Sequence, residues 1–169
     1  GPVLVVAPTK PYAMDLARAV AAILPLAERA RALHELVERR LGGDHPLAES
    51  VAKGVAYHHG SLSRDIQAAI EVAIGEGGLD VVVATTTLTE GVNLPVRSVV
   101  VAAQGSWGAS GFSEYITGAT LLNAIGRAGR AARETEGWVV LARQAEYDPA
   151  DFDRLEPTEV DLAAISNLA

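Results

Sequence analysis

Three arginines recur at every third position in one stretch of the chain, and glycines flank the first two. They are Arg127, Arg130 and Arg133, with Gly126 and Gly129 between and before them. If residue 127 opens a helical turn, the three side chains share one side of it. A guanidinium is always charged, and its planar fork of donors suits phosphate oxygens. Glycine lets the backbone approach a bulky anion. The stretch alone fits a phosphate site or a solvated basic helix face.

The elements that would position this stretch follow an alternating pattern. Short apolar runs rich in valine are typical of buried parallel strands, and the segments between them have helical spacing. This alternation predicts a parallel sheet covered by helices on both faces. The expected strands are 3–7, 54–58, 80–84, 98–102 and 137–141, and the expected helices are 12–24, 27–41, 47–53, 64–74 and 159–168. Ser63 is expected to cap the fourth helix, and Gln104 to Gly118 is expected to be a surface loop.

Function in such sheets lies on the loops that leave the carboxyl ends of the strands. Four stretches of the chain that carry polar or glycine-rich sequence occupy these loops. They are residues 8–10, 59–63, 85–95 and the approach to 126–130. A random basic patch would not predict this convergence on one edge of one sheet.

Composition limits the classes of function. The 169 residues are 49% hydrophobic with 5% aromatics, as expected for one α/β domain, and the chain has no cysteine for a disulfide or thiolate metal site. No signal peptide or membrane-length apolar run is seen, so we expect a cytoplasmic domain without a membrane partner. Gly1-Pro2 is typical of a tag-cleavage scar. The net charge of −7 argues against strong nucleic-acid binding by the isolated chain, but permits a local phosphate-facing strip.

The chain lacks the parts to hold a nucleoside triphosphate and magnesium unaided. Its two lysines, Lys10 and Lys53, lie in Pro-Thr-Lys-Pro and Ala-Lys-Gly, and neither belongs to a glycine-rich phosphate loop. No metal site is expected either. His58 and His59 are adjacent, but the other two histidines lie far away in sequence, so a turn-stabilising or strand-contacting role is favoured for the pair.

Two longer motifs resemble those of a known family. Residues 84–95 (ATTTLTEGVNLP) and 123–130 (NAIGRAGR) resemble motifs V and VI of superfamily 2 DExH helicases, with a spelling similar to the Ski-like branch. Residues 8–10 resemble motif IV, and residues 57–64 resemble the His-His segment of that branch. The resemblance covers about Val3 to Ala142. It implies a three-layer RecA-like (P-loop NTPase-like) α/β domain, with a mainly parallel sheet flanked by helices, over residues 3–150. Residues 151–169 would be an acidic tail and helix leading to the next domain.

The resemblance implies roles at an ATP site shared between two domains. ATP and Mg²⁺ would be held mainly by a first RecA-like domain of the same chain, which supplies the phosphate loop and the DExH carboxylates. Arg127 and Arg130 fall on the two motif VI arginines, with Arg130 the first choice for the arginine finger that stabilises transition-state charge. Asn93 stands where many relatives have Asp, and Asn123 replaces the usual Gln with a shorter amide. The implied nucleotide-binding residues are Gly91, Asn93, Asn123 and Gly126.

The resemblance also implies a path for single-stranded or partly duplex nucleic acid across the same edge. In relatives, hydroxyls and backbone N–H groups there contact the sugar–phosphate backbone, which carries no sequence information. Such contacts explain how an acidic domain can touch a strand, with the first domain supplying much of the electrostatics. The implied nucleic-acid-binding residues are Thr9, Lys10, His59, Gly60 and Thr85.

The function expected from these features is that of the second motor domain of an ATP-dependent nucleic-acid helicase or translocase. The full-length protein would hydrolyse ATP, and the isolated domain would be folded but catalytically silent. The alternative is a degenerate helicase domain that acts as a nucleic-acid- or protein-binding scaffold. Retention of Arg127, Arg130 and Gly91 speaks against such decay.

Overall fold

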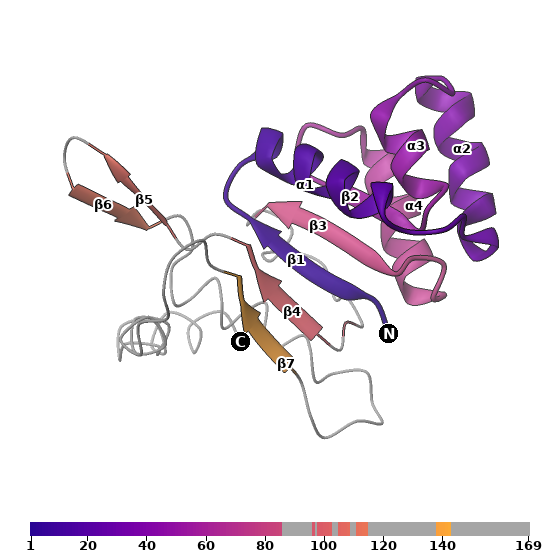
Figure 1. Cartoon of the computed structure of the whole chain (residues 1–169). Coiled ribbons are helices and arrows are strands. Elements are labelled where there is room, and N and C mark those ends of the chain that lie inside the picture. The colour runs from indigo at the N-terminus through magenta and orange to yellow at the C-terminus, as the bar shows by residue number, and fades with distance from the viewer. Residues whose placement is uncertain (86–95, 97, 103–104, 109–110, 115–137, 143–169) are drawn as a thin grey trace, which may run out of the picture.

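The computed structural model in Figure 1 describes residues 1–85, 96, 98–102, 105–108, 111–114 and 138–142. A five-stranded parallel sheet forms its centre, in the order β2-β3-β1-β4-β7. The strands are β1 (Val3–Ala7), β2 (Val55–His58), β3 (Val81–Thr85), β4 (Ser98–Val101) and β7 (Trp138–Leu141). The expected strands are therefore confirmed to within one residue at each end. The parallel α/β sheet is the predicted fold class.

The helices lie over the half of the sheet that contains β2 and β3 (Figure 1). They are α1 (Lys10–Ala22), α2 (Arg31–Leu41), α3 (Pro46–Val51) and α4 (Arg64–Gly75), with a 3₁₀ turn η1 (Glu28–Ala30) before α2. The helix expected over 27–41 is thus a 3₁₀ turn followed by an α-helix. α1 begins at Lys10, two residues before the prediction, because Thr9 caps it and Pro11 fits its first turn.

Two consecutive residues of β2 show that helices cover both faces of the sheet. Neighbouring side chains of a strand point to opposite faces. Tyr57 lies close enough to Arg18 of α1 for that charge to lower the pKa of its phenol, although burial, the larger effect, raises it. The imidazole of His58 lies 3.4 Å from the carboxylate of Glu71 on α4. Helices α1 and α4 therefore lie on opposite faces, as predicted.

The core consists of aliphatic side chains from the strands and the inner faces of the helices. Leu4, Val6, Val82 and Val99 are at most 1% exposed, and α4 contributes Ile66, Ile70 and Ile74. Burying an aliphatic side chain of this size stabilises the fold by about 1.5–3 kcal/mol. The continuous valine runs in the sequence are the direct cause of strands buried on both faces.

The expected surface loop over Gln104–Gly118 was wrong for part of its length. Residues Gly105–Gly108 (β5) and Gly111–Glu114 (β6) form an antiparallel pair in which Trp107 is opposite Phe112. The glycine and serine content suggested a loop. Trp and Phe are strand-favouring residues, however, and two short antiparallel strands satisfy each other's backbone hydrogen bonds.

Candidate functional site

The carboxyl edge of the sheet brings together the ends of three neighbouring strands, β1, β2 and β3. Ala7 at the end of β1 is level with Thr85 at the end of β3, and His58 at the end of β2 is level with Ala84. The loops after β1 and β2 therefore begin beside the carboxyl end of β3. The charge of Lys10 is also close enough to help lower the pKa of His59. Thr9, Lys10, His59, Gly60 and Thr85 accordingly lie at one edge, as the sequence predicted.

The loop after β1 is short and ends in a capped helix. Thr9 has an extended backbone (φ −139°, ψ 159°), and its hydroxyl oxygen accepts a hydrogen bond from the N–H of Tyr12 at 3.4 Å. Both Thr9 and Lys10 are exposed. The hydroxyl of Thr9 therefore has a structural role, while Lys10 presents its ammonium group to solvent at this edge.

The loop after β2 is organised around a buried imidazole. His59 is 5% exposed, stacks on Tyr57 with ring centroids 5.6 Å apart, and accepts a hydrogen bond from the N–H of Ser61 on Nδ1 at 3.3 Å. Burial is the main cause of the lowered pKa of His59, followed by the charges of Lys10 and His58. The uncharged imidazole thus stabilises the turn, which is one of the two roles expected for it. A contact between His59 and nucleic acid stays a prediction.

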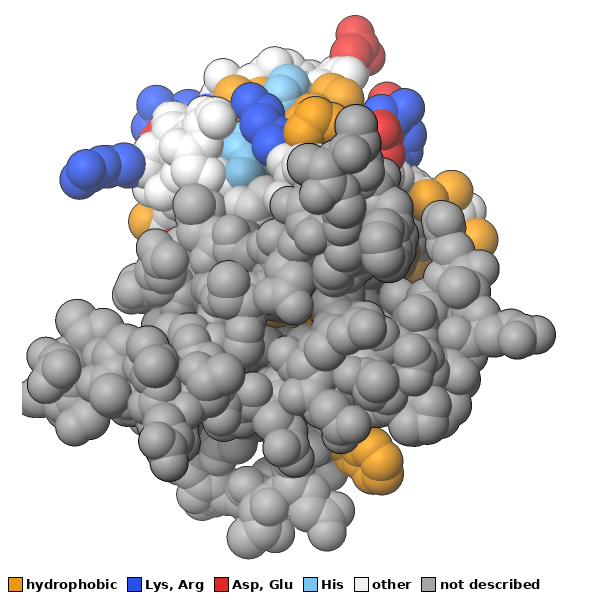
Figure 2. Space-filling view, turned by 90° about the vertical axis from the view of Figure 1, so that its left-hand side faces the viewer, with side chains coloured by type: hydrophobic (Ala, Val, Ile, Leu, Met, Phe, Trp, Pro, Cys, Tyr) orange, Lys and Arg blue, Asp and Glu red, His pale blue; other side chains and the backbone are white. Residues whose placement is uncertain are grey.

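Gly60 in this loop is exposed to solvent. Its φ is not positive, and a Cβ built on it would meet nothing within 4 Å. Neither backbone conformation nor packing within the described residues requires glycine at this position. Figure 2 shows this face of the molecule, on which histidine and basic side chains lie next to each other over the described part. A glycine with free space around it allows the close approach of a ligand backbone.

Gln67 on α4 also shapes the loop, and it was not among the site residues predicted from the sequence. Its side-chain amide Nε2 donates to the carbonyl oxygens of His59 at 3.2 Å and Leu62 at 3.0 Å. Ser63 occupies the predicted N-cap position of α4, but its side chain makes no capping hydrogen bond. Its hydroxyl instead bonds to the carboxylate of Asp65, the main cause of the lowered pKa of Asp65.

His58 is buried beneath this edge without a hydrogen-bond partner among the described residues. Burial lowers the pKa of its imidazole to about 4, so it is uncharged at neutral pH. The 3.4 Å approach of its Nε2 to Glu71 is then a contact between a neutral ring and a carboxylate. Within the described ranges, no three His, Cys, Asp or Glu side chains are grouped in a way that could hold a metal ion.

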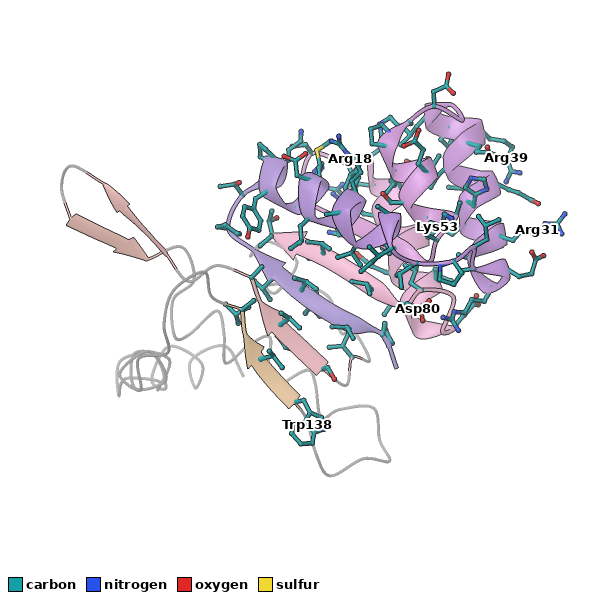
Figure 3. The ribbon with its side chains drawn as sticks, viewed as in Figure 1. Arg18, Arg31, Arg39, Lys53, Asp80 and Trp138 are labelled. Atoms are coloured by element: carbon teal, nitrogen blue, oxygen red, sulfur yellow. The ribbon has the colours of Figure 1, made fainter. Side chains whose placement is uncertain are left out.

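The opposite edge of the sheet carries a different surface. A cavity of about 330 Å³ is lined by Leu24–Arg29, Lys53 and Asp80, and an ion pair joins Arg29 to Asp80. Figure 3 shows Asp80 near the start of β3 and Trp138 at the start of β7, away from the arrowheads. The two lysines of the chain therefore lie at opposite edges of the sheet, Lys10 at the carboxyl edge and Lys53 at the cavity.

The predicted nucleotide-binding and catalytic residues lie outside the described residues. They are Gly91, Asn93, Asn123, Gly126, Arg127 and Arg130. The predicted helix at 159–168 and the tail at 151–169 lie outside them as well. In the part of the chain that is described, no helix has the length and apolar character needed to span a membrane.

A five-stranded parallel sheet, flanked by helices and with its polar loops on the carboxyl edge, defines the chain as a RecA-like α/β domain. Residues 27–132 match the family described as "Helicase conserved C-terminal domain". The chain belongs to this family, as a second RecA-like domain of the Ski-like branch of superfamily 2 helicases.

Several curated relatives share this region. Identity is 39% over 120 residues to "ATP-dependent DNA helicase Hel308" of Thermoplasma acidophilum, covering 69% of this chain and 18% of that protein. It is 32% over 117 residues to "ATP-dependent DNA helicase MER3" of Saccharomyces cerevisiae, covering 69% and 10%. It is 36% over 117 residues to "Helicase POLQ-like" of Caenorhabditis elegans, covering 69% and 12%. The chain thus spans less than a fifth of the length of each of these three relatives.

Proposed function

We propose that this chain is the second motor domain of an ATP-dependent helicase or translocase that moves along single-stranded DNA. The observation that carries the proposal is the convergence of Thr9, Lys10, Gly60 and Thr85 on one edge of a helicase-family domain. DNA is the proposed strand because two of the relatives are named as DNA helicases. The chemistry of hydroxyls and N–H groups at this edge suits a sugar–phosphate backbone.

On the nucleotide side, the proposed mechanism needs another domain besides this one. ATP and Mg²⁺ are held by a first RecA-like domain, and Arg127 and Arg130 reach the γ-phosphate from this one. Arg130 stabilises the charge that develops on the transferred phosphoryl group, an effect on the order of 10³–10⁵ in rate. Gly91, Asn93, Asn123 and Gly126 contact the nucleotide. Family membership and the absence of a phosphate loop from the sequence support this division of labour.

On the nucleic-acid side, the proposed contacts are made mainly by Lys10 and Gly60, which are exposed, whereas Thr85 is buried at the end of β3. Lys10 supplies a positive charge next to a phosphate, and the exposed backbone of Gly60 donates its N–H to a phosphate oxygen. Thr9 and Thr85 lie beside these contacts, at the carboxyl ends of β1 and β3. His59, whose imidazole is buried, acts by holding the turn that carries Gly60.

Two glycine variants test the strand-side proposal in the intact protein. Gly60→Ala adds a methyl group that meets no described residue within 4 Å but would meet a bound nucleic-acid strand. We expect the single-stranded DNA concentration that half-saturates ATP hydrolysis to rise at least about tenfold, because a hydrogen bond to a charged group contributes about 1.5–3 kcal/mol. Single-stranded RNA of the same sequence, assayed in parallel, should stimulate less.

Gly75→Ala is the matched control. Gly75 also has no positive φ and no atom within 4 Å of a built Cβ, but it ends α4 away from the carboxyl edge. This variant should half-saturate at the wild-type DNA concentration. If the two variants behave alike, Gly60 is not a strand contact. Stronger stimulation by RNA would contradict the proposed choice of strand.

A further inference from the structure

We infer that Gln67 is a positioning residue for the nucleic-acid strand, which holds the loop 59–63 so that the exposed backbone of Gly60 meets the strand in a fixed position. The inference rests on the proposed function, since Gly60 is the proposed strand contact. It extends that function to a residue on α4 that lies outside the resemblance motifs.

The geometry of Gln67 is that of a clamp between helix and loop. Its Nε2 donates to the carbonyl oxygen of His59 at 3.2 Å and to that of Leu62 at 3.0 Å. A side-chain amide NH₂ carries two N–H donors, so it serves both acceptors at once. The two carbonyls belong to opposite ends of the turn that contains Gly60. Gln67 itself is anchored in α4, where its backbone N–H donates to the carbonyl of Ser63 at 3.0 Å.

Two further hydrogen bonds close the same turn. The N–H of Leu62 donates to the carbonyl of His59 at 3.1 Å, and the N–H of Ser61 donates to Nδ1 of His59 at 3.3 Å. The His59 carbonyl therefore accepts from both the loop and α4. Four hydrogen bonds surround Gly60, although Gly60 has no side chain to hold it in place. Because the turn is already fixed before binding, less conformational entropy is lost when a nucleic-acid strand binds.

The chemistry of the clamp predicts a ranking of variants. Gln67→Ala removes both donors. Gln67→Glu keeps the shape but replaces the donors with a carboxylate that faces two carbonyl oxygens, so it should be at least as damaging. Gln67→Arg restores N–H donors in the same region. Val72→Ala is the control, because Val72 lies on the same helix and is 58% exposed.

The first measurement is ATP hydrolysis by the intact protein as single-stranded DNA is titrated. We expect Gln67→Ala and Gln67→Glu to raise the half-saturating DNA concentration about tenfold, equivalent to about 1.4 kcal/mol, with the rate at saturating DNA retained. Gln67→Arg should recover most of the affinity, and Val72→Ala should match the wild type. A lowered saturating rate at unchanged half-saturation would overturn the inference.

A double variant separates positioning from an independent contact. If Gln67 acts through Gly60, then combining Gln67→Ala with Gly60→Ala should cost little more than Gly60→Ala alone. Multiplied effects of the two single variants would show that Gln67 does not work through Gly60, and would contradict the inference.

Amide hydrogen exchange in this chain tests the clamp independently of the proposed function. In Gln67→Ala and Gln67→Glu, the amides of Ser61 and Leu62 should exchange at least tenfold faster than in the wild type, equivalent to about 1.4 kcal/mol. The core amides of β1 should be unchanged. Unchanged exchange at Ser61 and Leu62 refutes the clamp. Faster exchange, together with an intact wild-type protein that DNA does not stimulate, refutes the proposed function but not the clamp.

Discussion

Mild acid should destabilise this domain through His58. The imidazole of His58 is 5% exposed, and burial lowers its pKa from 6.5 to about 4. Between these two values the unfolded chain binds more protons than the folded one. The free energy of unfolding is therefore not reduced by His58 above pH 6.5, the pKa of His58 in the unfolded chain, and it decreases as the pH is lowered toward 4. The lowered pKa of His59 acts in the same direction.

The size of the effect follows from the two pKa values of His58. Between pH 7 and pH 5, a shift from 6.5 to about 4 amounts to about 2 kcal/mol of lost stability. With a urea dependence of about 2 kcal/mol per molar, the unfolding midpoint should fall by about 1 M. The assay is urea unfolding of the chain, followed by far-ultraviolet circular dichroism, at pH 7 and pH 5.

Three variants assign the acid sensitivity to its source. His58→Gln cannot bind a proton in this range, so most of the difference between the two pH values should vanish. Glu71→Gln removes the carboxylate that lies 3.4 Å from His58 and would attract an imidazolium, so the acid loss should be at least as large as in the wild type. His34→Gln alters an imidazole that keeps 27% of its side-chain surface in solvent, and should preserve the acid loss. An equal midpoint shift in wild type and His58→Gln would refute the reasoning.

Two further perturbations concern stability. Gly54→Ala places a Cβ 2.8 Å from Asp80 Oδ2 and 3.1 Å from the Cβ of Ala27, at a φ of +76°. It should destabilise the domain more than Gly77→Ala does. Gly77 has a similar φ (+73°), but no described atom lies within 4 Å of its built Cβ, so its substitution should cost only the roughly 1–2 kcal/mol of a left-handed backbone conformation. Equal midpoints in thermal unfolding would contradict the packing argument. Thr9→Ala removes the N-cap of α1 and should cost about 0.5–2 kcal/mol in urea unfolding, whereas Thr9→Ser keeps the hydroxyl and should retain most of that stability.

The sheet could be predicted from the sequence because its signal is local. β1 and β3 consist almost entirely of apolar residues, and the last four residues of each are buried, which is the pattern expected for strands covered on both faces. Helix boundaries were less accurate where side-chain chemistry decided them. Because of Thr9 and Pro11, α1 begins earlier in the sequence than predicted, and the chain from Glu28 to Ala30 forms a 3₁₀ turn before α2. The antiparallel pair of β5 and β6 was not predicted, because the glycines of this segment suggested a loop despite its two aromatic residues.

The position of the candidate site could also be predicted, but its internal contacts could not. The carboxyl ends of parallel strands lie at one edge of a sheet, so the sequence pattern already predicts that Lys10, Gly60 and Thr85 lie at the same edge. The clamp by Gln67 depends on how α4 is rotated above the loop, which no local pattern encodes. Likewise, the direction of the His59 ring, and hence its burial, is fixed by Tyr57 and by the N–H of Ser61. The open space around Gly60 is a three-dimensional property.

We propose above that this domain completes an ATP site held by another domain of the same protein. The most direct test compares ATP binding and DNA-stimulated hydrolysis in the intact protein before and after Arg130→Ala. We expect hydrolysis to fall by about 10³-fold or more, while the Kd for ATP stays within a few fold of the wild type. Near-normal hydrolysis by Arg130→Ala would contradict this proposal.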